Sequence, residues 1–78
     1  MSDTETQWGL CEPGYWLLQP DGTNRFAEVI LEDDGAYVWY VMDDGDRANG
    51  EAETLQVAQA EAAAAFFAYM AAHPEDDA

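Results

Sequence analysis

The pattern of apolar residues changes once along the chain, near Thr54, and this change limits the folds open to it. Before Thr54, short runs of β-branched and aromatic residues alternate with turn residues, which is typical of strands. After Thr54, apolar residues recur with helical spacing until Pro74. A chain of 78 residues is long enough for one domain only. The pattern therefore predicts an α+β domain, in which a three- to four-stranded antiparallel sheet is packed on one face by a single long C-terminal helix.

Turn residues mark the ends of the predicted strands. Three strands are predicted between them, at Tyr15–Gln19, Arg25–Glu32 and Ala36–Met42. A short fourth strand near Arg47–Glu51 stays open as an alternative. The domain should span residues 8–73, with residues 1–7 and 74–78 as solvated acidic tails.

The helix is predicted over Leu55–Ala72, with Thr54 as its N-cap. Its Ala-rich composition favours a helix by intrinsic propensity. One stripe of mostly small apolar side chains should pack on the sheet: Leu55, Ala58, Ala62, Ala65, Phe66, Tyr69 and Met70.

The turn at Asp33–Gly35 decides which side chains face the helix. With Asp34 and Gly35 as a two-residue turn, one face of the hairpin would form the core, made by Ala27, Val29, Leu31, Val38, Tyr40 and Met42. The other face would carry Glu28, Ile30, Glu32, Tyr37 and Trp39. Because one helix covers one face of a sheet, we expect this second face to be open. A change of one residue in the length of this loop would exchange the pairing partners.

The charge of the chain excludes several classes of function. Its 17 Asp and Glu residues are opposed only by Arg25 and Arg47, which gives a formal net charge of −15. Such a chain repels nucleic acid and anionic membranes and is attracted to basic surfaces. The acidic start of the sequence, and the lack of an apolar run of about 18 residues, predict a cytoplasmic protein without a membrane span.

No residues group into a catalytic or metal-binding motif. Cys11 and His73 are each the single residue of their kind, which excludes an internal disulfide and disfavours a zinc site. The acidic segment Asp43–Glu53 has the composition of a calcium loop, but Ala48 and Asn49 stand where an EF-hand needs a ligand and a glycine. We therefore expect no enzymatic activity, no cofactor and no metal, with a looser calcium or magnesium loop in this segment as the alternative.

The carboxylates gather at the turns on both sides of the most apolar strand. They cluster at 32–34, 43–46 and 75–77, whereas the helix has only Glu61 after its first turn. Halophily, or a merely solvated surface, explains the composition better than it explains this arrangement. Alternate residues of a strand lie roughly 6.6 Å apart, so carboxylates on strands and turns could occupy phosphate sites of a basic protein groove. The partner-binding residues predicted in this way are Glu28, Glu32, Asp33, Asp34, Tyr37, Trp39, Asp43, Asp44 and Asp46.

Two segments carry a resemblance to a known class of proteins: "GYWLLQPDGTNRFAEVILEDDGAYVWYVMDDGD" and "GEAETLQVAQAEAAAAFFAYM". In size, charge and layout the chain resembles the small acidic phage-encoded anti-CRISPR proteins, especially inhibitors of type I surveillance complexes. The resemblance implies an inhibitor, in the host cytoplasm, that mimics DNA, binds a basic Cas surface and blocks DNA recognition without catalysis. The alternative is a self-associating structural or accessory protein, dimeric through the open aromatic face, whose acidity serves solubility or halophily.

Overall fold

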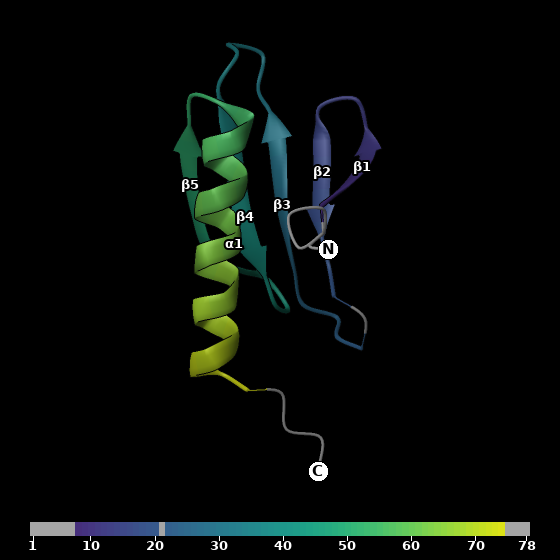
Figure 1. Ribbon diagram of the computed structural model, residues 1–78, viewed down its shortest axis with the longest axis vertical. Helices are drawn as coiled ribbons and strands as arrows, with labels where there is room; N and C mark the ends of the chain where they lie inside the picture. The colour runs from purple at the N-terminus through teal and green to yellow at the C-terminus, as the bar shows by residue number, and fades with distance from the viewer. Residues whose placement is uncertain (1–7, 21, 75–78) are drawn as a thin grey trace, which may run out of the picture.

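The computed structural model describes residues 8–20 and 22–74, and within them it has an α+β fold. Five antiparallel strands precede one helix: β1 (Gly9–Glu12), β2 (Tyr15–Leu18), β3 (Phe26–Leu31), β4 (Tyr37–Met42), β5 (Asp46–Ala52) and α1 (Leu55–Ala72). Each strand pairs with the next one along the chain, so the sheet is a meander in the order β1-β2-β3-β4-β5 (Figure 1). The predicted fold class is confirmed, although the sheet has more strands than we expected. Of the tails predicted at 1–7 and 74–78, only Pro74 lies within the described residues.

β1 is the strand that the sequence pattern did not predict. All four of its residues are exposed, so it shows no alternation of apolar and polar positions. It joins β2 through a turn at Pro13 and Gly14, and Gly14 has a φ of +86°. A proline followed by a glycine with positive φ is typical of a type II turn. The "PG" dipeptide is therefore the feature of the sequence that indicates this hairpin.

The helix begins and ends where the sequence predicts. The Thr54 hydroxyl accepts a hydrogen bond from the Val57 N–H at 3.2 Å, and the His73 N–H donates to the Tyr69 carbonyl at 2.8 Å. Ala58, Ala62 and Phe66 are fully buried. The other members of the predicted stripe are half-buried: Leu55, Ala65, Tyr69 and Met70. The helix packs on β3, β4 and β5, so the predicted core stripe is confirmed.

The β3–β4 turn differs from the predicted one by a single residue. The Glu32 N–H donates to the Ala36 carbonyl at 2.8 Å, and the Gly35 N–H donates to the Glu32 carbonyl at 3.0 Å. Asp33–Gly35 therefore form a three-residue loop, in which Gly35 takes the left-handed conformation with a φ of +91°. As a result Val29 pairs with Trp39, and not with Tyr40 as predicted. The predicted register was wrong, and every side chain of β4 lies on the opposite face from the one expected.

Trp39 is consequently a core residue, with 9% of its surface exposed. Its cross-strand partner on β5 is Gly50, and a Cβ atom at Gly50 would lie only 2.7 Å from Cζ2 of the indole. The indole Nε1 donates to Glu61 Oε1 on α1 at 3.2 Å. Ala48 and Ala52, two further small residues of β5, are half-buried and pack against the same core. Small residues on β5 thus make room for Trp39 and for the helix.

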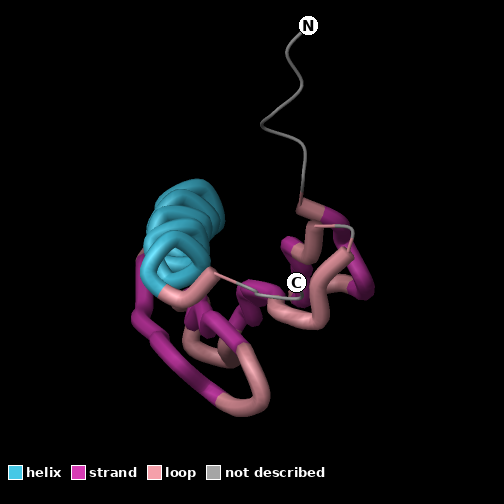
Figure 2. Tube along the Cα trace, turned by 90° about the horizontal axis from the view of Figure 1, so that it is seen from below, coloured by secondary structure: helices cyan, strands magenta, loops and turns pink. Residues whose placement is uncertain are grey.

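Three aromatic residues extend the core beside the helix. Trp8, Trp16 and Tyr37 pack against the buried cluster, and the rings of Trp16 and Tyr37 lie 6.0 Å apart, tilted by 55°. Figure 2 shows that α1 covers only part of one side of the curved sheet. The three aromatic residues lie on that same side, because they pack against the buried cluster. Our expectation that Tyr37 and Trp39 lie on the open face was therefore wrong.

Candidate functional site: an open sheet face with acidic ends

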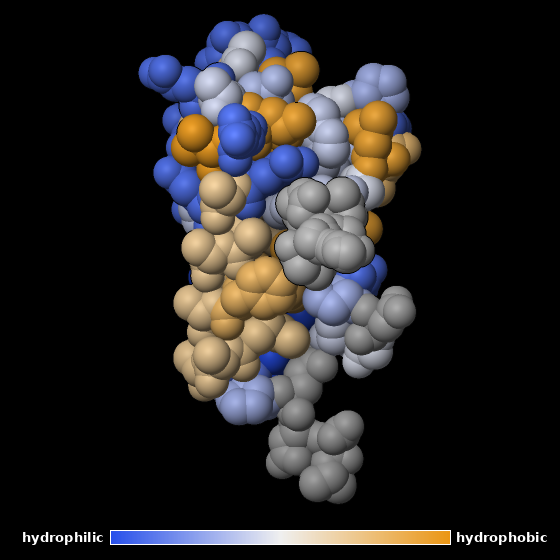
Figure 3. All heavy atoms as spheres, in the orientation of Figure 1, coloured by the Kyte–Doolittle hydropathy of each residue, from blue (hydrophilic) through white to orange (hydrophobic). Residues whose placement is uncertain are grey.

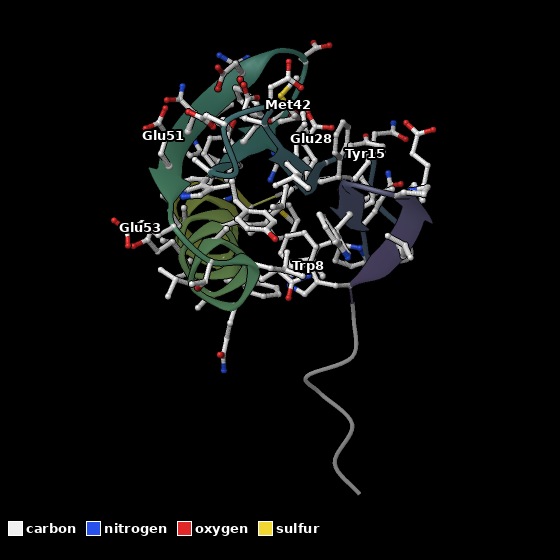
Figure 4. The ribbon with its side chains drawn as sticks, turned by 90° about the horizontal axis from the view of Figure 1, so that it is seen from above. Trp8, Tyr15, Glu28, Met42, Glu51 and Glu53 are labelled. Atoms are coloured by element: carbon white, nitrogen blue, oxygen red, sulfur yellow. The ribbon has the colours of Figure 1, made fainter. Side chains whose placement is uncertain are left out.

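The face of the sheet that points away from α1 is not covered by any element of the described residues. We call it the open face. By strand register it comprises Tyr15, Leu17, Phe26, Glu28, Ile30, Val38, Tyr40, Met42, Asn49 and Glu51. Figure 4 shows Tyr15, Glu28, Met42 and Glu51 projecting on the side of the sheet opposite α1, while Trp8 lies on the α1 side. The open face is therefore mostly apolar, with two carboxylates set among half-buried side chains.

This face agrees with the sequence prediction on β3 and differs from it on β4. Glu28 and Ile30 lie on the open face as expected. The aromatic residues there are Phe26, Tyr15 and Tyr40, in place of Tyr37 and Trp39. A glycine as the third residue of the Asp33–Gly35 loop is the feature that would have indicated the correct register, because such a glycine favours three-residue hairpin loops.

Acidic loops stand at the two ends of the open face. Glu32, Asp33 and Asp34 are exposed at the β3–β4 turn, at the top of Figure 1, and Asp44 and Asp46 are exposed at the β4–β5 turn, at the bottom. β4 has six residues and separates the two loops by about 20 Å. The predicted acidic residues thus form two groups with Glu28 between them, and not one continuous row.

Asp43 differs from the other predicted acidic residues because its contacts are internal. Its Oδ2 atom lies 3.2 Å from Nε of Arg25 and accepts a hydrogen bond from the Tyr69 hydroxyl at 2.6 Å. That hydrogen bond raises the pKa of Tyr69 above its ordinary value. Arg47 donates from Nε to the Asp43 carbonyl at 2.8 Å, and Arg25 also donates to the His73 carbonyl. Asp43 therefore fixes the end of the helix to the sheet.

Both arginines of the chain lie beside Asp43. Within residues 8–20 and 22–74, neither arginine forms an ion pair with a carboxylate of the open face. Among the acidic residues of the end loops in these ranges, Asp43 is the one that pairs with an arginine. The other carboxylates of the open face and its end loops are Glu28, Glu32, Asp33, Asp34, Asp44, Asp46 and Glu51. Their negative potential is therefore available to a partner.

A groove of about 620 Å³ lies at the upper end of the open face, between the β1–β2 turn and β3. We call it the β1–β2 groove; it is lined by Glu12, Pro13, Gly14, Tyr15, Glu28, Ile30 and Leu31. The Leu31 N–H donates to the Gly14 carbonyl at 2.9 Å, which fixes the turn to the end of β3. Sequence reasoning missed this groove because it did not predict β1.

Inside the β1–β2 groove, the Tyr15 hydroxyl donates to Glu28 Oε1 at 2.7 Å. This hydrogen bond, together with desolvation and the negative charge of Glu28, raises the pKa of Tyr15 to about 12. The hydrogen bond from the hydroxyl also restricts the orientation of the Glu28 carboxylate.

Other kinds of site were also considered in the described part of the chain. No three His, Cys, Asp or Glu residues there come together in a way that could hold a metal ion. The segment considered as a calcium loop forms the β4–β5 turn and β5. Among the same residues, no helix has both the length and the apolar character needed to cross a bilayer.

In comparisons with known proteins, no family model matches the chain, and neither a curated protein nor a solved structure shows significant similarity to it. The resemblance to anti-CRISPR proteins therefore remains an expectation from size, charge and layout.

Proposed function

We propose that the protein is a non-enzymatic inhibitor that docks its open face and acidic end loops on a basic, nucleic-acid-binding surface of another protein. The observation that supports this function is an apolar sheet face between two loops rich in carboxylates. Apolar contact at the centre of an interface supplies most of its affinity, and charge at the rim speeds and orients association. An occupied surface would no longer bind nucleic acid.

The spacing of the carboxylates suits such a surface. Glu28 and Glu51 lie two strands apart on the open face and are offset by two residues along the strands, or roughly 12 Å, and the end loops lie about 20 Å apart. A duplex strand carries one phosphate per about 3.4 Å of axial rise, so these distances correspond to a few phosphates. Basic residues that bind several phosphates could therefore pair with carboxylates of the same face.

The aromatic part of the proposed interface follows the observed register. Tyr15 and Tyr40 take the place of Tyr37 and Trp39, and Asp43 is left out because its carboxylate pairs with Arg25. The acidic part comprises Glu28, Glu32, Asp33, Asp34, Asp44 and Asp46. As target class we take the DNA-binding surface of a type I Cas surveillance complex, which the resemblance to anti-CRISPR proteins implies.

A displacement assay tests this function. The protein is titrated into a panel of type I surveillance complexes, each bound to a fluorescent target duplex, and DNA release is followed by anisotropy. We expect release from at least one complex, and a loss of inhibition as added salt shortens the screening length from about 10 Å at 0.1 M to about 3 Å at 1 M. The protein alone should not bind the duplex, because its field repels phosphate. Binding of the duplex by the protein alone would contradict the proposal.

Self-association is a second candidate, and a different surface favours it. The outer face of α1 exposes Phe67 and Val57 by 48% and 45%, and residues 62–72 of the helix carry no charge. Figure 3 shows apolar colouring along the lower half of the helix. Two chains of net charge −15 would meet with least repulsion along residues 62–72, which carry no carboxylate. Repulsion between carboxylates also disfavours a dimer through the open face, which was the alternative that the sequence analysis kept.

A further inference from the structure

We propose that the β1–β2 groove is a binding pocket for an arginine side chain of the partner protein. This inference rests on the proposed function, since it specifies how one part of the open face would recognise a basic surface. It adds a defined site, with a defined ligand chemistry, to an interface that is otherwise described only by its charge.

The groove offers an apolar wall and an acidic end, the two features that an arginine side chain needs. Pro13, Ile30 and Leu31 line it with apolar surface, while Glu12 and Glu28 contribute carboxylates. The methylene stem of arginine packs on apolar surface while its charged head group pairs with carboxylates. A purely apolar ligand would leave both carboxylates without a cation.

Glu28 is held in an orientation that suits a guanidinium group. The Tyr15 hydroxyl donates to Oε1 of Glu28 at 2.7 Å and so restricts rotation of the carboxylate. A guanidinium group can form paired hydrogen bonds with a carboxylate and can stack on an aromatic ring, which a lysine ammonium does less well. The Tyr15 ring also lines the groove. The site therefore favours arginine over lysine.

Neither arginine of the chain supplies a cation to this site. Arg25 lies on the α1 side of the sheet, where it contacts Asp43 and the Tyr69 ring. Arg47 lies at the start of β5, next to the β4–β5 turn. The β1–β2 turn, which lines the groove, lies at the opposite end of the sheet from the β4–β5 turn (Figure 1). A volume of about 620 Å³ also accommodates the backbone on either side of the bound side chain.

The test is a titration of the ¹⁵N-labelled protein with N-acetyl-arginine methylamide at about 0.15 M salt, followed by two-dimensional NMR. We expect chemical-shift changes concentrated in residues 12–15 and 28–31. Binding of the norleucine analogue, which lacks the charge, should be about tenfold weaker or more. Glu28→Gln keeps an oxygen for the Tyr15 hydroxyl but removes the charge, and should weaken arginine binding about fivefold or more.

Glu51→Gln is the matched control, because it removes an equal charge from the same face two strands away. It should change arginine binding by less than about twofold. Equal losses from the two variants, or shifts spread over the whole acidic surface, would overturn the arginine site. Such a result would not contradict the proposed inhibitor function, because the displacement assay measures binding by the whole open face and tests that function separately. If arginine binds in the groove but the protein releases no duplex from any surveillance complex, the proposed function is contradicted and the arginine site is retained.

Discussion

The indole ring of Trp39 lies over Gly50 on the neighbouring strand so closely that no side chain fits between them. A Cβ atom at Gly50 would lie 2.7 Å from Cζ2 and 2.9 Å from Nε1 of the indole. The same Nε1 atom donates to Glu61 on α1. This one contact connects β4, β5 and the helix, and it depends on a glycine in the middle of a strand, where glycine is otherwise unfavourable.

Replacing this glycine should therefore destabilise the fold. We expect Gly50→Ala to lower the free energy of unfolding by about 1–3 kcal/mol, because the indole has to move out of a well-packed position. Urea denaturation followed by circular dichroism measures this. Asn49→Ala, in the same strand but on the open face, is the control and should cost less than about 0.5 kcal/mol. Equal costs would show that the close approach of Trp39 does not matter.

A second prediction concerns the contact between Arg25 and Asp43. The Arg25 side chain is only 13% exposed, and it joins Asp43, the Tyr69 ring and the last turn of the helix. Arg25→Met should lower the free energy of unfolding by about 2 kcal/mol, because hydrogen bonds to charged groups are lost from a largely buried position. Arg47→Met removes an exposed arginine beside the same aspartate and should cost less than about 1 kcal/mol. A larger cost for Arg47→Met would contradict our assignment.

A third prediction follows from the raised pKa of Tyr15, which moves from 10.0 to about 12. The folded state favours the neutral hydroxyl of Tyr15, so the stability that this hydroxyl contributes is fully present below about pH 10. That contribution is lost as the pH rises from about 10 through about 12. Carbon-13 NMR of the tyrosine Cζ atoms measures the pKa, and Glu28→Gln should move it towards the ordinary value. An unchanged pKa in that variant would mean that Glu28 is not the main cause.

The stability arising from Tyr15 can be isolated by comparison with Tyr15→Phe. The difference in unfolding free energy between the wild type and this variant should be constant up to about pH 10 and shrink above it. Taking the difference removes the contribution of Tyr69, whose pKa is also raised. A difference that grows above pH 10 would contradict the sign of the shift.

The fourth prediction tests self-association. If the outer face of α1 forms a dimer, Phe67→Gln should convert it to a monomer, since Phe67 is the large aromatic side chain exposed there. Sedimentation equilibrium at several protein concentrations measures this. Tyr40→Gln on the open face is the control and should leave the dimer intact. A wild type that stays monomeric over the whole range would rule out this second candidate.

The structural features predicted most accurately from the sequence are those that depend on residues close together in the chain. Thr54, Pro74 and the alanine run determine the helix locally, and its observed bounds, Leu55–Ala72, agree with the prediction. The positions of β2, β3 and β4 were also close to the observed ones, because turn residues separate them. β5 was left open because its glycine and polar residues give a weak strand pattern.

The features that failed depend on contacts between distant residues. One extra loop residue at the β3–β4 turn exchanged the faces of β4, and the burial of Trp39 also required a glycine eleven positions later on β5. The role of Asp43 depends on Arg25 and Tyr69, which meet it only in the folded chain. The β1–β2 groove depends on an exposed edge strand that has no apolar pattern.

The fifth prediction separates a specific acidic surface from bulk charge. Reversing Glu32, Asp33 and Asp34 to lysine changes the net charge from −15 to −9, because each reversal adds two charges and three reversals add six. Reversing Glu75, Asp76 and Asp77 gives the same net charge from the end of the chain. Circular dichroism controls for folding of both variants, because reversal of Asp34 removes the hydrogen bond from the Ala36 N–H to Asp34 Oδ1 at 3.0 Å, while both reversals reduce self-repulsion.

The decisive measurement uses a surveillance complex from which the wild-type protein releases the target duplex. For each variant, it determines the protein concentration that releases half of the duplex. We predict that reversal at Glu32–Asp34 raises this concentration about 100-fold or more, through lost steering and lost pairing with the basic surface. Reversal at 75–77 should raise it less than about threefold. Equal effects would mean that bulk charge alone acts, and no effect of reversal at Glu32–Asp34 would contradict the proposal that this acidic end of the open face binds a basic partner.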